Sequence, residues 1–85
     1  MKKIIVLIPI VYHNSRKVCE LIQEQKFEKH LDLMSYIEQH LELKANEEAE
    51  NVLIFDLNDF MDEVNDQELP DLNGYFMSYV NFKNL

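Results

Sequence analysis

Residues 3–12 read KIIVLIPIVY, and eight of these ten residues are apolar. Most of them are β-branched, which favours an extended chain. Apolar and polar residues do not alternate along the run, so we expect a strand that is buried on both faces. A buried helix would also be apolar throughout, but the length of the run and Pro9 favour the strand. Pro9 cannot donate a ladder hydrogen bond and therefore belongs near the end of this strand or at a bulge.

Two sets of apolar residues with helical spacing follow the first strand. They are Val18, Cys19, Leu21 and Ile22, and then Phe27, Leu31, Met34, Ile37 and Leu41, with Leu33, Tyr36 and Leu43 widening the second set. At about 100° per residue the two sets would point to opposite sides of one straight helix. We therefore predict a break near residues 23–26 and two helices, over 15–24 and 27–44. The alternative is that residues 16–22 form a second strand paired with the first.

The second half of the chain predicts two more strands and a helix. Residues 51–55 are a short apolar strand, and residues 56–59 hold cap-type side chains before a helix that extends to about Asp66. A loop over 69–74 contains Asn73-Gly74, a pair able to take positive φ, and residues 75–82 form the last strand.

The resulting order β-α-α-β-α-β predicts a single compact α+β domain over residues 1–85. We expect a small two-layer sandwich with a three- or four-stranded sheet, the N-terminal strand central and the helices mainly on one face. Eighty-five residues are enough for one hydrophobic core with little to spare.

Charge is distributed unevenly along the chain, whose net charge is −8. Residues 42–71 carry eleven acidic residues against Lys44 alone, which gives this window −10 and leaves +2 for the rest. The acids are Glu42, Glu47, Glu48, Glu50, Asp56, Asp59, Asp62, Glu63, Asp66, Glu68 and Asp71. An acidic protein is a poor partner for nucleic acid or anionic lipid, so we expect neither direct nucleic-acid binding nor membrane binding.

The acidic window predicts a surface that docks on a basic protein partner. Tyr75, Met77 and Tyr79 alternate along the last strand and would share one face, where they form an apolar patch suited to a partner. The candidate partner-binding residues are therefore Glu47, Glu48, Glu50, Asp59, Asp62, Glu63, Asp66, Tyr75, Met77 and Tyr79.

Two other functions fit the same composition. The acidic window could imitate nucleic acid, as in the short acidic inhibitors that phages and mobile elements direct against nucleases or defence proteins. Alternatively, the basic first third of one copy could face the acidic window of another copy and form a homodimer with a structural or accessory role.

Known catalytic and metal-binding patterns are absent from the sequence. Residues 56–61 begin like a calcium loop but have Phe60 and Met61 where a ligand and a glycine are needed. No pair of histidines has the i, i+4 spacing of a helical zinc site, and there is no phosphate-binding glycine loop. Residues 74–82 lack the basic and central aromatic residues of an RNA-binding RRM strand. We therefore expect a non-enzymatic protein with no cofactor and no metal.

Cys19 is the single cysteine, so no intramolecular disulfide can form, which fits a cytoplasmic protein. Its apolar neighbours and Glu20 predict a buried, unreactive thiol rather than a nucleophile. The apolar run after Lys2 and Lys3 is too short to span a bilayer and lacks the cleavage site of a signal peptide, so we interpret it as part of the fold.

Overall fold

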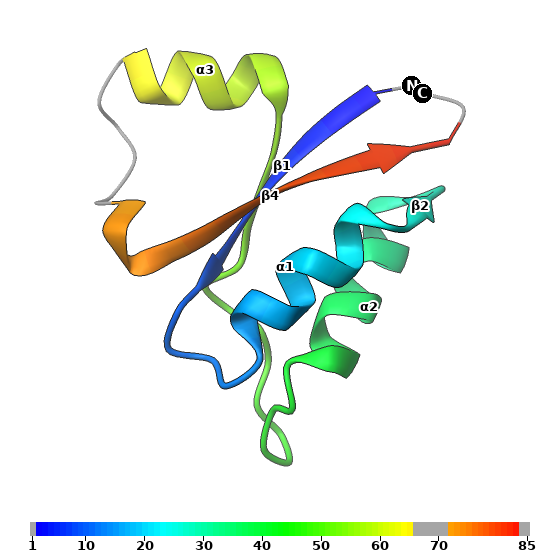
Figure 1. Cartoon of the computed structure of the whole chain (residues 1–85), viewed down its shortest axis with the longest axis vertical. Helices are drawn as coiled ribbons and strands as arrows, with labels where there is room; N and C mark the ends of the chain where they lie inside the picture. The colour runs from blue at the N-terminus through cyan, green and yellow to red at the C-terminus, as the bar shows by residue number, and fades with distance from the viewer. Residues whose placement is uncertain (1, 66–71, 84–85) are drawn as a thin grey trace.

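A computed structural model describes residues 2–65 and 72–83 of the chain. The predicted order β-α-α-β-α-β is confirmed, and a two-residue strand is added between the first two helices (Figure 1). The elements are β1 (Lys2–Pro9), α1 (Ser15–Gln23), β2 (Lys26–Phe27), α2 (His30–His40), β3 (Leu53–Asp56), α3 (Leu57–Asn65), the 3-10 helix η1 (Leu72–Gly74) and β4 (Tyr75–Phe82).

The four strands form one mixed sheet in the order β2-β4-β1-β3. β1 lies between β4 and β3 and is antiparallel to both, so the prediction of a central N-terminal strand is confirmed. β2 runs parallel to β4 and forms one edge of the sheet, while β3 forms the other edge.

β1 is buried on both faces, as its unbroken apolar sequence predicts. Ile4, Val6 and Ile8 join the core under α1 and α2, whereas Ile5 and Leu7 pack with Phe60 of α3. In Figure 1, α1 and α2 lie on one side of the strands and α3 lies on the opposite side. The domain is therefore a sheet covered by two helices on one face and by α3 alone over part of the other.

The apolar run of residues 3–12 extends past the end of β1. β1 ends at Pro9, where the sequence places its end, but Ile10 and Val11 are 46% and 83% exposed. The residues after Pro9 form a turn in which the Tyr12 amide donates to the Pro9 carbonyl at 3.3 Å. The buried Ser15 hydroxyl, at the start of α1, donates to the same carbonyl at 2.5 Å.

The predicted helix over residues 15–24 is confirmed as α1 (Ser15–Gln23). The alternative of a second strand over 16–22 is therefore wrong. Val18, Cys19 and Ile22 form its buried face. The predicted break after this helix is confirmed, since α1 ends at Gln23 and β2 follows.

α2 is shorter than the predicted helix over 27–44. Phe27 belongs to β2, where its carbonyl accepts a hydrogen bond from the Lys83 amide at 2.8 Å. At the other end Glu42 has φ 53°, a left-handed conformation that ends the helix after its C-cap residue Leu41. The buried face consists of Leu33, Ile37 and Leu41. Leu31 is exposed, because at about 100° per residue it lies on the side of the helix away from Leu33.

α3 begins as its cap-type residues predict. Oδ1 of Asp56 accepts a hydrogen bond from the Asp59 amide at 2.8 Å, which is N-cap geometry. The preceding strand is shifted by one or two residues, from the predicted 51–55 to Leu53–Asp56. Asn73 and Gly74 lie in η1, and neither takes the positive φ of which the pair is capable. Residues 69–71 of the predicted loop lie outside the described residues.

Candidate functional site

The three apolar candidates of β4 lie on one face of the sheet. Met77 stands opposite Leu7 and Tyr79 stands opposite Ile5 in the β1–β4 register. These β1 residues pack with Phe60, so Tyr75, Met77 and Tyr79 share the face on which α3 lies. Tyr75 is half-buried, while Met77 and Tyr79 are each 45% exposed beside the helix. The ammonium of Lys3 lies 5.4 Å from the centre of the Tyr79 ring and covers part of it.

Three acidic candidates lie in the loop between α2 and β3. The Lys44 amide donates to Oε2 of Glu47 at 3.0 Å, and the Glu47 amide donates back to the Lys44 carbonyl at 3.0 Å. Ala49 is buried in the core between the exposed Glu48 and Glu50. The loop is therefore anchored at both its turn and its middle, and we name residues 47–50 the acidic loop.

The remaining described acidic candidates belong to α3. Asp59 lies in the first turn, where its charge favours the helix dipole, and Asp59 and Asp62 are exposed. Glu63 is half-buried. Asp66 lies outside the residues that the structure describes.

The acidic window does not form one continuous surface in the described part of the chain. The acidic loop and α3 lie at opposite ends of the longest dimension of the molecule, which measures 36 Å (Figure 1). β3 joins them, because the loop leads into the strand and α3 starts directly after it. The single acidic surface expected over residues 42–71 is thus corrected to two acidic segments, one at each end of an extended strand.

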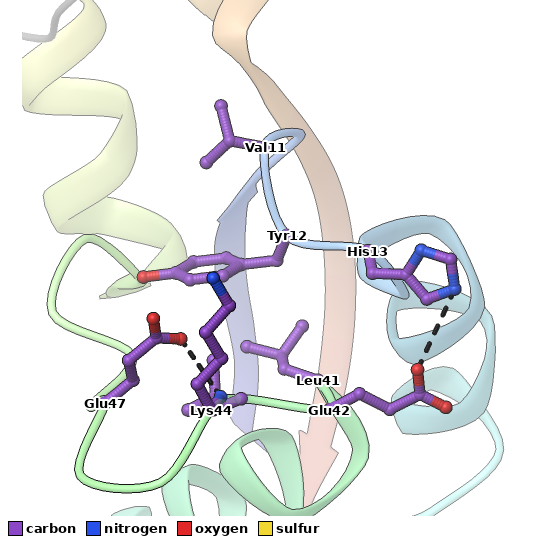
Figure 2. Close-up of a pocket in the computed structure, with 8 residues that line it drawn as sticks. Val11, Tyr12, His13, Leu41, Glu42, Lys44 and Glu47 are labelled. Carbon is purple, nitrogen blue, oxygen red and sulfur yellow. Dashed lines mark hydrogen bonds and ion pairs between the residues drawn. The ribbon is translucent and has the colours of Figure 1, made fainter.

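A pocket of about 360 Å³ lies between the β1–α1 loop and the segment that follows α2. In Figure 2 the Lys44 side chain extends toward the Tyr12 ring with Glu47 beside it, and His13 and Glu42 lie together further to the right. His13 Nε2 lies 3.8 Å from Oε2 of Glu42. Sequence reasoning missed this pocket because its two walls are about thirty residues apart in the chain and no motif links them.

The charges that line the pocket do not select a ligand. Two carboxylates, one lysine and one histidine line it, and this mixture of acidic and basic groups singles out no class of ligand. The left-handed conformation of Glu42 is explained by its position after α2 as the residue that ends the helix. The pocket therefore carries no functional assignment.

His30, His40 and Cys19 pack against neighbouring residues, whereas His13 is exposed. His30 lies beside the Phe82 ring and His40 is stacked on the Tyr36 ring, with centroids 5.1 and 4.2 Å apart. Within residues 2–65 and 72–83, no group of three His, Cys, Asp or Glu side chains is arranged to hold a metal ion. Cys19 is buried, and burial raises the pKa of its thiol to about 11, with Glu20 as a second cause.

The fold and the surface define the chain as a small α+β domain with an open apolar strip on one sheet face and two acidic segments. Comparisons of the chain with protein-family models, with curated proteins and with solved structures found no match. None of the helices in the described ranges has the length and apolar character needed to cross a membrane.

Proposed function

We propose that this protein is a non-enzymatic interaction module that docks on a basic protein partner through its two acidic segments. The observation that supports this proposal is the run of residues 45–65, which holds seven acidic residues and no Lys, Arg or His. Most of these acids are exposed, in the acidic loop and on α3. A concentration of one charge sign on anchored segments attracts a partner of the opposite sign and orients it during encounter.

The exposed strip formed by Met77 and Tyr79 supplies a second, apolar contribution to the same docking. Aromatic and methionine side chains are enriched in the buried centres of protein interfaces, while charges are found at the rim. The strip lies on the face that carries α3, so a partner that contacts the acids of this helix can also cover the strip.

The test is affinity capture from a native lysate at low and at high salt, about 0.05 M and 0.5 M. Two variants remove acids: E47Q/E48Q/E50Q in the loop and D59N/D62N in α3. The matched control E20Q/E24Q/E28Q removes three exposed acids outside the window. We expect a basic protein to bind at low salt, to be lost at high salt, and to bind about tenfold more weakly to either acidic variant than to the control.

Different outcomes separate the proposal from the other functions. Loss of the captured partner on addition of DNA would indicate a nucleic-acid mimic, since the partner's binding groove would then be one for phosphates. Capture that survives high salt but is lost in Tyr79→Ser would assign the docking to the apolar strip. Equal binding by the acidic variants and the control would refute the acidic docking surface.

A further inference from the structure

β3 is an edge strand, and within residues 2–65 and 72–83 no strand pairs with its outer side. It pairs with β1 through Leu53 to Asp56 and is the last strand of the sheet. In an antiparallel pair, alternate residues direct their N–H and C=O groups away from the partner strand. Along Leu53, Ile54 and Phe55, some of these groups therefore point to the outer side of β3. No backbone hydrogen bond links residues 53–55 to any described residue outside β1.

The opposite edge of the sheet is protected in ways that β3 is not. There β2 supplies a short strand that begins with the charged Lys26, and its backbone pairs with the end of β4. Further along β4, the Cys19 thiol of α1 donates to the Phe76 carbonyl at 3.8 Å. Short charged strands and covering helices are the usual means of preventing strand addition. β3 is also short and ends at the charged Asp56, but among the described residues it has no strand on its outer side as β4 has in β2. Leu53, Ile54 and Phe55 are each half-buried against one of the two cores.

The two acidic segments flank this edge. The acidic loop ends at Glu50, three residues before β3, and Asp59 lies three residues after it. A strand added to β3 would therefore have negative charge near both of its ends. Positive residues at the ends of the incoming segment would complement this pattern.

We propose that the outer edge of β3 accepts an extended segment of a basic protein partner as an additional strand, with Lys or Arg residues on both sides of its paired part. The inference rests on the proposed acidic docking function and specifies how the partner binds. Backbone hydrogen bonds then supply affinity, and the two acidic segments select a basic segment over others. A second copy of this chain is a poor occupant, because antiparallel pairing centred on Ile54 and Phe55 would bring Glu50 of one copy toward Asp59 of the other.

The test uses synthetic peptides of about eight residues, long enough for one strand. The probe has alternating valine and threonine between two pairs of lysines. One control peptide has glutamates in place of the lysines, and a second keeps the lysines but carries N-methyl groups on alternate backbone amides. Binding to the full chain is followed by titration and by hydrogen exchange of the residue 53–55 amides in NMR spectra.

We expect the lysine peptide to bind and to slow exchange of an outward β3 amide at least tenfold. The glutamate and N-methyl peptides should bind at least about tenfold more weakly, and E50Q/D59N should weaken the lysine peptide to a similar extent while E20Q/E24Q does not. Equal binding of the lysine and N-methyl peptides, or no protection of β3, would overturn strand addition. If lysate capture still depends on the acidic segments in that case, the proposed function survives and only the binding mode fails.

Discussion

At the scale of single residues, the buried thiol of Cys19 gives a direct measure of how closely α1 covers the sheet. With its pKa raised to about 11 by burial, the thiol stays protonated at neutral pH. Two pKa units above the ordinary value correspond to roughly a hundredfold smaller thiolate fraction. We expect alkylation by iodoacetamide at pH 8 to be at least that much slower in the native protein than in guanidinium chloride. Rapid labelling of the native protein would show that the thiol is accessible and ionised.

The same shift predicts how stability depends on pH. Between the ordinary thiol pKa and about 11 the unfolded state holds fewer protons at Cys19 than the folded state, so the free energy of unfolding falls as pH rises through this interval. Other groups also titrate in this interval. The contribution of Cys19 is therefore the difference between the native chain and Cys19→Ala in how far the free energy of unfolding falls. The alanine variant should lose less stability from pH 9 to pH 11, measured by urea denaturation. An identical pH dependence in both chains would contradict the assignment.

Glu42 predicts a stabilising substitution. A non-glycine residue in the left-handed region costs about 1–2 kcal/mol, and glycine removes that cost while losing about 0.5–1 kcal/mol of chain entropy. The contact of Glu42 with His13 is solvent-exposed and contributes little. We expect Glu42→Gly to raise the free energy of unfolding by about 0.5–1 kcal/mol. The control Glu38→Gly, inside α2, should lower it by about 1 kcal/mol.

At the scale of elements, the junction between β3 and α3 depends on one cap. Asp56 ends the strand, and its side chain holds the third amide of the helix. We expect Asp56→Ala to cost about 1 kcal/mol in urea denaturation, the usual loss for an N-cap. Asn58→Ala, exposed in the same turn, should change stability by less than about 0.5 kcal/mol. Similar effects at both positions would mean that the cap does not stabilise α3.

At the scale of the whole molecule, β4 joins the two ends of the chain. It pairs with β1 along eight residues, and it supplies Val80 and Phe82 to the core under α1 and α2. A chain that stops at Gly74 would leave β1 with an open side and would remove the partner of β2. We expect it to show no cooperative unfolding transition by circular dichroism, while the full chain shows one. A cooperative transition in the shortened chain would show that β4 is dispensable.

The sequence by itself determined the three helices, the strands β1, β3 and β4, and the central place of β1 in the sheet. The buried character of β1, its end at Pro9, the helix break before Lys26 and the cap at Asp56 all follow from local rules about which residues fit which backbone. The alternation of residues 75–82 likewise predicted that Tyr75, Met77 and Tyr79 share a face. These predictions succeeded because each depends on side chains close together in the chain.

Only the tertiary structure decided the contacts between distant segments. Phe27 became a strand residue because Phe82 and Lys83 lie beside it, and the pocket exists because the turn at Tyr12 lies near Lys44. The acidic window is divided between two ends of the molecule because the extended strand β3 lies between the acidic loop and α3. The sequence gives the number of acidic residues in the window. It does not give their positions on the folded surface, because those positions depend on how the chain folds between them.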